Sequence, residues 1–497
     1  MTGKVTLVGA GPGDPGLLTR KGEAALRGAE VVVYDRLIVP ELLELLPPTA
    51  ERIDVGKQAD CHPAPQWRIN EILVEKALEG KNVVRLKGGD PFLFGRGGEE
   101  LDLLAEHHIP FEVVPGVTSA IAAPAYGGIP VTHRDYASSL HIVTGHAKAG
   151  SPLRINFRAL AEAGGTCVFL MGVSALERIC GGLLEAGMAE NTPAAVVERG
   201  TLPGQRKVVS TLGRLAEEAR RAELHSPAVI VVGGVAALSD RFDWFDALPL
   251  KGRTIVVTRS KRRAGALRSR LRELGADVVD YPCIETVPRR ENPALEQCLA
   301  QINRFDWVAF TSSAGVEVFF DALWRLGMDG RALSGVKLAA VGPSTAQALE
   351  TRHLRADYVP PVYDTEHLAL GLAARTKGPV LLPRAALGSP ILPRVLEEQG
   401  VAFTDVPVYD TVFPGENADE VRSLLAAGET WVTFTSASTV RGFVNSLEPG
   451  TDLSRVLWLC IGPQTAAECA RHGIRTRVAR EATVPALVDL ILDAAKE

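Results

Sequence analysis

Polar residues and glycines follow three apolar runs in the first half of the chain, and their types suggest ligand chemistry. The runs and the residues after them are 5–10 before Gly11–Asp14, 31–34 before Asp35 and Arg36, and 82–86 before Lys87–Asp90. Ligands of open α/β sheets bind beyond the carboxyl ends of the strands. Paired glycines there let backbone groups approach a ligand, and a carboxylate such as Asp90 can face a positive centre. The pattern predicts a site for a neutral or cationic small molecule.

The same glycines argue against two other kinds of site. A dinucleotide-binding turn has the spacing G-x-G-x-x-G, whereas the glycines here stand at 9, 11 and 13, with Pro12 inside the turn. No Gly-Lys-Ser or Gly-Lys-Thr follows the later glycines, which excludes a Walker-type phosphate loop. A nucleotide-dependent oxidoreductase is therefore disfavoured.

In the second half, hydroxyl residues follow apolar runs that occur twice. Trp307–Ser312 parallels Trp431–Ser436, and Val341–Ala346 parallels Ile461–Ala466. This duplication predicts two copies of one α/β unit, with a ligand site between two similar lobes. Hydroxyls at strand ends either cap the following helix or donate to an anion, and capping alone is the better account for Thr311 and Ser313. No Ser/His/Asp, Cys/His or paired-carboxylate set is evident in this half.

These residues need strands and helices to position them, and the chain supplies both throughout. Apolar runs alternate with amphipathic stretches on each side of a break, which predicts α/β architecture. The break follows the aromatic patch at 242–245. Because 497 residues exceed one ordinary hydrophobic core, we expect one domain over 1–246, a linker over 247–252 and a second domain over 253–497.

Composition limits the partners and the compartment. The net charge is −5 and neither half is basic, which argues against a nucleic-acid partner. The uncharged window 113–132 holds three prolines, so we expect no membrane segment. Seven cysteines without a C-x-x-C pair favour a reducing cytoplasm over a disulfide framework or a zinc site. The strand-like run right after Met1 predicts no signal peptide.

The first half carries ordered motifs that together resemble the tetrapyrrole methylases. The motifs are Val8–Asp14, Val33–Arg36, Val84–Phe92, Pro115–Ser119, Gly128–Asp135, Phe169–Gly172 and Val197–Thr201. Within that family, Gly95–Glu99 and the Thr-His-Arg-Asp run at 132–135 are similar to uroporphyrinogen-III C-methyltransferase. The resemblance covers roughly residues 3–245.

This resemblance implies a non-Rossmann fold of two α/β lobes that holds S-adenosylmethionine (SAM) in a cleft. The positions implied to line the cofactor pocket are Pro12, Gly88, Gly89, Asp90, Leu93, Thr118, Ser119, Met171 and Gly200. Asp35 matches the position assigned as proton acceptor, and Lys57 matches the one assigned as donor. A carboxylate at Asp35 would accept the proton shed during methylation or hold the pyrrole N–H groups.

The tetrapyrrole substrate carries carboxylates, and basic residues near the motifs are available to pair with them. Arg36, Arg96 and Arg134 are the first candidates for such contacts, with solvated surface charge as the alternative. Further candidates are Lys57, Lys87, His133 and His146. The family also implies a homodimer that forms through this half.

The second half resembles uroporphyrinogen-III synthase over about residues 252–492. The motifs are Val257–Arg259, Phe310–Ser313, Val341–Pro343, Val408–Thr411, Phe434–Ser436 and Ile461–Ala466. The family fold has two lobes, here 253–283 with 411–497 and 288–407, joined by a two-stranded connector. Tyr409 matches a tyrosine thought to assist departure of the substrate hydroxyl, with packing of the connector as the alternative role. Candidate donors to substrate carboxylates are Thr311, Ser312, Ser436 and Thr465.

Together the two resemblances imply a bifunctional enzyme of tetrapyrrole biosynthesis. It would cyclise hydroxymethylbilane to uroporphyrinogen III and methylate that product twice with SAM, giving precorrin-2 and S-adenosylhomocysteine without a metal. One alternative is a methylase of a different tetrapyrrole. Another treats the second half as a two-lobed ligand-binding module without activity. Whether the product feeds sirohaem or cobalamin is open.

Overall fold

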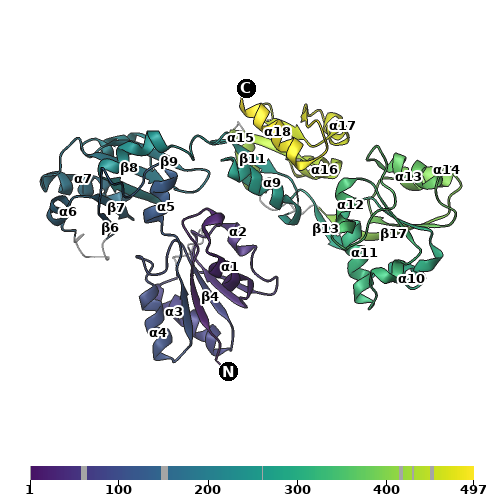
Figure 1. The fold of residues 1–497 in the computed structure, drawn as a ribbon, viewed down its shortest axis with the longest axis horizontal. Helices are drawn as coiled ribbons and strands as arrows, with labels where there is room; N and C mark the ends of the chain where they lie inside the picture. Colours follow the sequence, from purple (N-terminus) through teal and green to yellow (C-terminus); the bar gives the residue numbers. More distant parts are fainter. Residues whose placement is uncertain are drawn as a thin grey trace. The chain divides into compact units, whose positions relative to one another are not determined.

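The computed structural model describes residues 2–56, 64–146, 155–259, 261–412, 418–427, 430–447, 451 and 453–497. These residues form two compact units. Unit 1 consists of Met1–Gly252 with Arg272–Asp277, and unit 2 consists of Arg253–Leu271 with Val278–Glu497. Each unit contains two five-stranded sheets. Figure 1 labels many of their strands and helices and colours the chain by sequence. The predicted α/β architecture is therefore confirmed.

The first sheet of unit 1 has the order β3-β2-β4-β1-β5, and all its strand pairs are parallel. Its strands are β1 (Val5–Gly9), β2 (Val31–Tyr34), β3 (Glu51–Asp54), β4 (Val83–Lys87) and β5 (Phe111–Val114). The surrounding helices are the 3-10 helix η1 (Pro15–Leu17) and the α-helices α1 (Arg20–Arg27), α2 (Pro40–Leu43), α3 (Gln66–Leu78) and α4 (Gly97–Glu106).

Alternating side chains place apolar cores on both faces of this sheet. Leu7 of β1 shares a buried cluster with Leu73 of α3 and Leu104 of α4. Its neighbour Val8 lies in a second buried cluster, with Leu26 of α1. Successive strand residues point to opposite faces, so the sheet lies between two helical layers.

The second sheet of unit 1 has the order β6-β7-β10-β8-β9, with β6 and β7 parallel and the remaining pairs antiparallel. Its strands are β6 (Leu140–Thr144), β7 (Thr166–Leu170), β8 (Pro193–Glu198), β9 (Arg206–Thr211) and β10 (Ala228–Val232). The helices are α5 (Ser119–Tyr126), α6 (Phe157–Ala163), η2 (Val173–Ala175), α7 (Leu176–Glu185), α8 (Leu215–Arg221) and η3 (Gly234–Phe242). Residues of α7 and α8 pack on one face and those of α5 and η3 on the other.

One sheet of unit 2, the third in the chain, has the order β12-β11-β18-β19-β20. Its strands are β11 (Thr254–Val257), β12 (Asp277–Asp280), β18 (Thr430–Phe434), β19 (Leu457–Cys460) and β20 (Arg477–Val478). The helices of this lobe are α9 (Lys261–Glu273), α15 (Ala418–Ala427), α16 (Ala437–Ser446), α17 (Pro463–Arg471) and α18 (Val484–Ala495). Stacked and edge-on rings of Phe434, Phe443 and Trp458 fill its core.

The fourth sheet has the order β13-β17-β16-β14-β15. Its strands are β13 (Glu285–Pro288), β14 (Trp307–Phe310), β15 (Lys337–Ala340), β16 (Val380–Ala385) and β17 (Phe403–Val412). The helices are α10 (Pro293–Ala300), η4 (Ile302–Arg304), α11 (Ser313–Arg325), η5 (Gly330–Leu333), α12 (Pro343–Glu350), α13 (Thr365–Ala373) and α14 (Ile391–Glu398).

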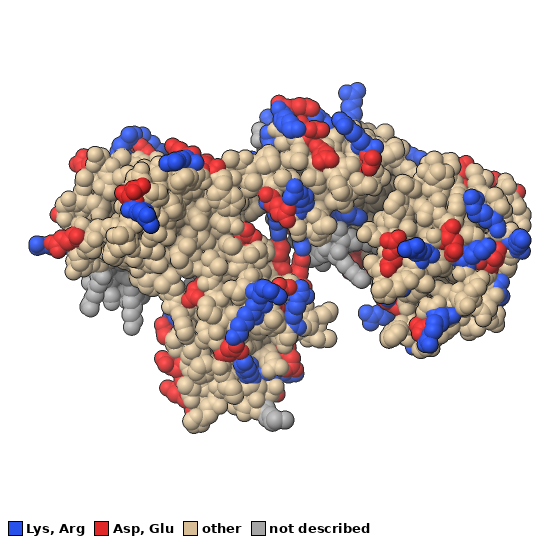
Figure 2. All heavy atoms as spheres, in the orientation of Figure 1, with Lys and Arg blue, Asp and Glu red and all other residues tan. Residues whose placement is uncertain are grey.

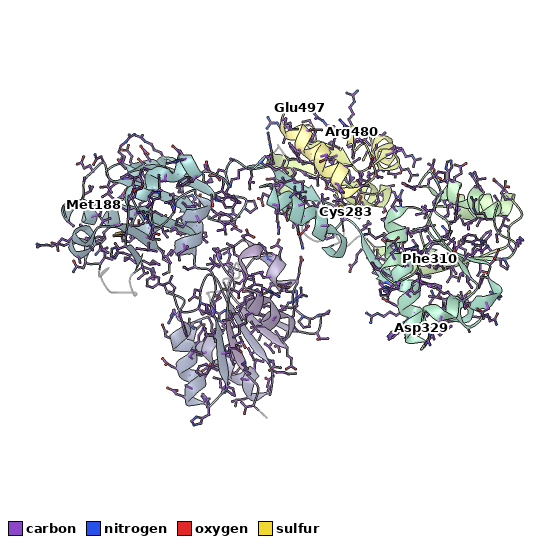
Figure 3. The ribbon with its side chains drawn as sticks, viewed as in Figure 1. Met188, Cys283, Phe310, Asp329, Arg480 and Glu497 are labelled. Carbon is purple, nitrogen blue, oxygen red and sulfur yellow. The ribbon has the colours of Figure 1, made fainter. Side chains whose placement is uncertain are left out.

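The two chain crossings between the lobes of unit 2 pair with each other. β13 runs antiparallel to the last part of β17, with Glu285 opposite Val412 and Pro288 opposite Tyr409. The first part of β17 instead runs parallel to β16. Cys283, labelled in Figure 3, lies just before β13, where the chain leaves the first lobe. Tyr409 therefore stands where the connector joins the fourth sheet.

The internal duplication appears as equivalent strand-to-helix turns. After β14, whose last residue Phe310 is labelled in Figure 3, the Ser312 hydroxyl accepts from Gly315 N at 3.0 Å and caps α11. After β18, the Ser436 hydroxyl accepts from Thr439 N at 3.3 Å and caps α16. Gly-Pro steps then begin α12 and α17. The same sequence pattern has produced the same local structure twice.

In the view of Figure 2, basic and acidic side chains are interspersed over the visible faces of both units. Among the described residues, no helix is long and apolar enough to cross a membrane.

Candidate functional sites

Three glycines bring the carboxyl ends of β1, β4 and β5 into backbone contact. A Cβ on Gly116 would lie 2.2 Å from the Gly89 carbonyl oxygen and 2.7 Å from the Gly9 Cα. No side chain fits at such distances, so only glycine allows this approach. Gly89 and Gly11 also exchange backbone hydrogen bonds of 3.2 and 2.7 Å. The edge thus carries backbone rather than side chains, as the paired glycines predicted.

Asp90 fastens the loop after β4 to the loop after β5. One carboxylate oxygen accepts from Phe92 N at 2.8 Å and from Leu93 N at 3.1 Å, and the other accepts from Gly116 N at 3.0 Å. The side chain of Leu93 packs against the apolar cluster of the second sheet. The Asp90 carboxylate therefore holds backbone in place, and its contact with the positive centre of a ligand stays a prediction.

A hydrogen-bonded chain connects the Gly-Pro-Gly-Asp turn to the second half of unit 1. The hydroxyl of Tyr126, the last residue of α5, donates to the Asp14 carboxylate at 2.5 Å. The backbone N–H of Asp14 donates to the Thr201 hydroxyl at 3.1 Å. Burial, followed by the Asp14 carboxylate, raises the pKa of Tyr126, so the phenol stays protonated and keeps donating. Pro12, between Gly11 and Asp14, is positioned by these contacts.

The other predicted cofactor residues lie in three places of the same unit. Thr118 caps α5 by accepting from Ala120 N at 3.2 Å, and Ser119 is the first residue of that helix. Gly200 packs on α5, since a Cβ there would lie 2.4 Å from the Ala123 methyl. Met171 follows β7 with a φ of 55° and is about half exposed. Gly200 thus lies against α5, the helix that begins at Thr118 and Ser119.

Asp35 lies at the outer end of a buried set of charges. Its carboxylate accepts from Arg85 Nη2 at 2.8 Å, and Arg85 Nε donates to Glu100 Oε1 at 3.1 Å. Lys87 Nζ donates to the same Glu100 oxygen at 2.7 Å. Asp35 is one third exposed, whereas the other three side chains are at most 5% exposed. Burial and the neighbouring Arg85 charge lower the pKa of Lys87.

This network was missed by sequence reasoning, which considered Lys87 as a cation available to the substrate. Arg85 and Lys87 stand two apart on β4 and so point to one face, which is a usable signal. Glu100 follows the motif Gly95–Glu99 and carried no prediction. Its pairing could not be foreseen because it depends on how α4 packs on the sheet.

The three predicted substrate arginines are exposed on loops and helix starts. Arg96 forms a two-pronged ion pair with Glu99 at 2.9 and 2.6 Å. It is the N-cap residue of α4, with a left-handed φ of 58°. Arg36 directly follows the acceptor position Asp35, and Arg134 lies in the turn between His133 and Ala137. Lys57, the predicted proton donor, lies outside the described residues.

In unit 2 the structure joins two of the predicted residues directly. The Tyr409 and Ser312 hydroxyls are 2.8 Å apart. Tyr409 is buried and packs in the core of the fourth sheet's lobe, so it has the packing role and a hydrogen-bonded hydroxyl together. Thr311 is half-buried beside Ser312, and Ser436 lies at the equivalent turn of the other lobe. Thr465 is buried in the first turn of α17, which limits its access to a ligand.

Two family models match this chain, one in each half. The family model of the tetrapyrrole (corrin/porphyrin) methylases matches residues 4–216, and that of uroporphyrinogen-III synthase HemD matches residues 265–489. The fold and the sites thus define a methyltransferase half followed by a synthase half.

Single relatives span both halves. The porphyrin biosynthesis protein HemD of Ruminiclostridium josui is 49% identical over 99% of this chain and 98% of its own length. The uroporphyrinogen-III C-methyltransferase of Bacillus subtilis is 44% identical over 70% of this chain and 72% of its own length. A crystal structure of uroporphyrin-III C-methyltransferase from Thermus thermophilus complexed with S-adenosyl homocysteine is 41% identical and covers 48% of this chain and all of that one, with a TM-score of 0.41.

This chain belongs to the family in which a tetrapyrrole methylase is fused to a uroporphyrinogen-III synthase. It is therefore an enzyme of tetrapyrrole biosynthesis with two catalytic halves.

Proposed function

We propose that this chain converts hydroxymethylbilane to uroporphyrinogen III with inversion of ring D, and then methylates that product at C2 and C7 to give precorrin-2. The observation that carries the proposal is the match of both halves, in order, to one relative over nearly the full length of each chain. The two proposed steps are consecutive, because the product of the synthase half, uroporphyrinogen III, is the substrate of the methyltransferase half.

The glycine edge of the first sheet fits SAM as the methyl donor. Gly89 has a left-handed φ of 67°, and a Cβ there would meet no atom within 4 Å, so open space lies next to its backbone. Residues proposed to hold the cofactor are Pro12, Gly88, Gly89, Asp90, Leu93, Thr118, Ser119, Met171 and Gly200. When bound, SAM supplies a methyl group on a sulfonium, which is electrophilic without a metal. The acceleration left to the protein is mainly positioning.

In the methylation, a pyrrole β-carbon would form the new bond to the methyl group while the bond between that methyl group and the SAM sulfur breaks, leaving S-adenosylhomocysteine. The β-carbon already carries a side chain, so the proton that is then lost comes from elsewhere on the tetrapyrrole. Asp35 is proposed to accept that proton, and this proposal is supported by its carboxylate, which is one third exposed and is paired with the buried Arg85. Lys57 is proposed as the proton donor. Arg36, Arg96 and Arg134 are proposed to pair with substrate carboxylates, where Arg96 would exchange its surface partner Glu99 for the substrate.

In the synthase half, the substrate loses its hydroxyl to give an azafulvene cation before ring closure. Tyr409 is proposed to donate to the departing hydroxyl, with its phenol oriented by Ser312. Backbone donors and hydroxyls at the helix starts would bind the substrate's carboxylates. Candidates among these are Thr311, Ser312, Ser436 and Thr465.

Two further features complete the proposal. The cysteines within the described residues are free and buried, which suits a reducing cytoplasm. We also propose a homodimer that forms through the methyltransferase half, as the methylase family implies.

The test is incubation of the full chain with hydroxymethylbilane and SAM, followed by mass analysis of the tetrapyrrole product. We expect a type-III product that gains two methyl groups, in the presence of a chelator as well as in its absence. A methylase of another tetrapyrrole would leave supplied uroporphyrinogen III unmethylated. A binding module without activity would leave only the spontaneous type-I isomer. Activity that a chelator abolishes and only a metal restores would contradict the metal-free mechanism.

A further inference from the structure

The buried charges behind Asp35 are arranged as a chain rather than as a cluster. Asp35, Arg85, Glu100 and Lys87 alternate in sign along their successive ion pairs, and their formal charges sum to zero. Of these four side chains, Asp35 is one third exposed to solvent and the other three are buried. The strand register explains why Asp35 pairs with Arg85. Val33 of β2 lies opposite Arg85 of β4, so Asp35, the residue after β2, lies beside the guanidinium.

Arg85 and Glu100 are each held by more than one hydrogen bond. Besides its two carboxylate partners, Arg85 donates to the carbonyl oxygens of Val33 and Leu86 through Nη1, at 3.3 and 3.1 Å. Glu100 Oε1 accepts from Arg85, from Lys87 and from Gln66 Nε2, the last at 3.1 Å. The guanidinium is thereby fixed in plane and cannot swing away from Asp35.

A buried network of ion pairs contributes little to the net stability of a fold. Removing ions from water costs several kcal/mol for each, and well-packed apolar side chains of similar volume often stabilise a core equally well. A buried network that ends at one partly exposed carboxylate is instead typical of a functional site. Burying a fixed cation behind a carboxylate sets the carboxylate's orientation without occupying its outward-facing oxygen.

We propose that Arg85 and Glu100 are positioning residues for Asp35: Glu100 locks the Arg85 guanidinium, which in turn holds the Asp35 carboxylate toward the tetrapyrrole that is methylated. Lys87 balances the buried charge of Glu100. This inference rests on the proposed function of Asp35 in methylation. It adds residues that contact neither substrate nor cofactor.

The test is a double-mutant cycle in the full chain, with uroporphyrinogen III and SAM supplied. Asp35→Asn, Glu100→Gln and the double variant are compared by kcat, by KM for uroporphyrinogen III and by calorimetric SAM affinity. We expect Glu100→Gln to lower kcat about 10–100-fold with KM and SAM affinity changed less than about threefold, because orientation and not binding is lost. If Glu100 acts through Asp35, the double variant should be no slower than Asp35→Asn.

Glu112→Gln is the matched control, because Glu112 of β5 also pairs with two basic side chains, here Lys4 and Lys21, but its side chain is about one third exposed. It should methylate like wild type. Should Glu100→Gln fail to fold, Arg85→Lys takes its place, since a lysine keeps the charge but cannot bond both carboxylates as the guanidinium fork does. We expect a similar loss in kcat from that variant.

The outcomes separate the two proposals. If wild type does not methylate uroporphyrinogen III, the proposed function fails, and this inference fails with it. If wild type and Glu112→Gln are equally active and Asp35→Asn is slow, but folded Glu100→Gln or Arg85→Lys matches wild type, the inference alone is overturned. It is also overturned if the losses from Asp35→Asn and Glu100→Gln multiply in the double variant.

Discussion

The Tyr409 hydroxyl and the Ser312 hydroxyl lie 2.8 Å apart although 97 positions separate them in the chain. Tyr409 comes from the part of β17 that pairs with the connector strand, and Ser312 caps α11. Ser312 Oγ already accepts from Gly315 N at 3.0 Å, and its own proton can be donated to Tyr409. The phenol proton is then free for another acceptor, which is the arrangement that assistance of a leaving hydroxyl requires.

We predict that Tyr409→Phe lowers formation of the type-III product by about 10–100-fold, a loss smaller than that of a covalent nucleophile. The buried ring still packs, so the variant should melt like wild type. The measurement is the ratio of uroporphyrinogen III to the spontaneous type-I isomer. Complete loss of the type-III product in a folded variant would show that enclosure and orientation between the lobes are not the main source of catalysis.

Ser312→Ala and Ser436→Ala form a matched pair for the same assay. Both remove a helix cap and should cost about 1 kcal/mol of stability each. Of these two serines, Ser312 is the one whose hydroxyl bonds to Tyr409. Its variant should therefore lose more activity than the Ser436 variant, in which backbone N–H donors remain at the helix start. Equal losses would indicate that the caps matter only for folding.

We also predict that Asp90→Ala weakens SAM binding, while Asp35→Ala mainly slows methylation. Removing the Asp90 carboxylate releases three backbone N–H groups from the loops after β4 and β5, so the cofactor edge should lose its shape. Among the contacts described, the Asp35 carboxylate accepts a side-chain hydrogen bond only from the buried Arg85, so its loss should leave the cofactor edge intact. Calorimetry with SAM and turnover with uroporphyrinogen III separate the two effects. Unchanged SAM affinity in folded Asp90→Ala would count against a cofactor site at this edge.

The sequence predicted the α/β architecture and the strand ends where residues gather, because both follow from short-range patterns. The apolar run 82–86 became β4, and the repeated turns at Ser312 and Ser436 became equivalent helix caps. These features depend on neighbours within a few positions, and a single sequence contains them.

Long-range pairings were outside what the sequence could predict. Nothing local distinguishes a glutamate that binds Arg85 from one on a helix surface, and Glu99 and Glu100 are adjacent with opposite fates: Glu99 pairs with Arg96 at the surface, and Glu100 is fully buried. In the same way, the partnership of Tyr409 with Ser312 depends on how β17 crosses the lobe. Burial of Lys87 likewise turned an expected substrate contact into an internal ion pair.

A glycine substitution provides a test of the cofactor edge that involves no charge. Gly116→Ala would place a Cβ 2.2 Å from the Gly89 carbonyl oxygen, so the ends of β4 and β5 must separate. We predict that SAM affinity falls at least about tenfold, because the binding backbone shifts with them. Gly98→Ala, in the first turn of α4, is the control, since a Cβ there meets nothing within 4 Å. Equal SAM affinity in both folded variants would place the cofactor elsewhere.

The two halves of the chain should also work as separate fragments. Residues 1–248 should methylate supplied uroporphyrinogen III, and residues 250–497 should make it from hydroxymethylbilane, because each unit has its own sheets and buried clusters. The first fragment should leave hydroxymethylbilane to the spontaneous type-I route, and the second should bind no SAM by calorimetry.

Each fragment carries its own control in this experiment. Asp35→Ala should impair only the first fragment and Tyr409→Phe only the second, because the two sites share no residues. Mixing the wild-type fragments should restore conversion of hydroxymethylbilane to the dimethylated product, since free uroporphyrinogen III can diffuse between them. Two fragments that fold cooperatively but are each inactive would mean that the sites depend on one another, and the interpretation of two independent enzymes would then be wrong.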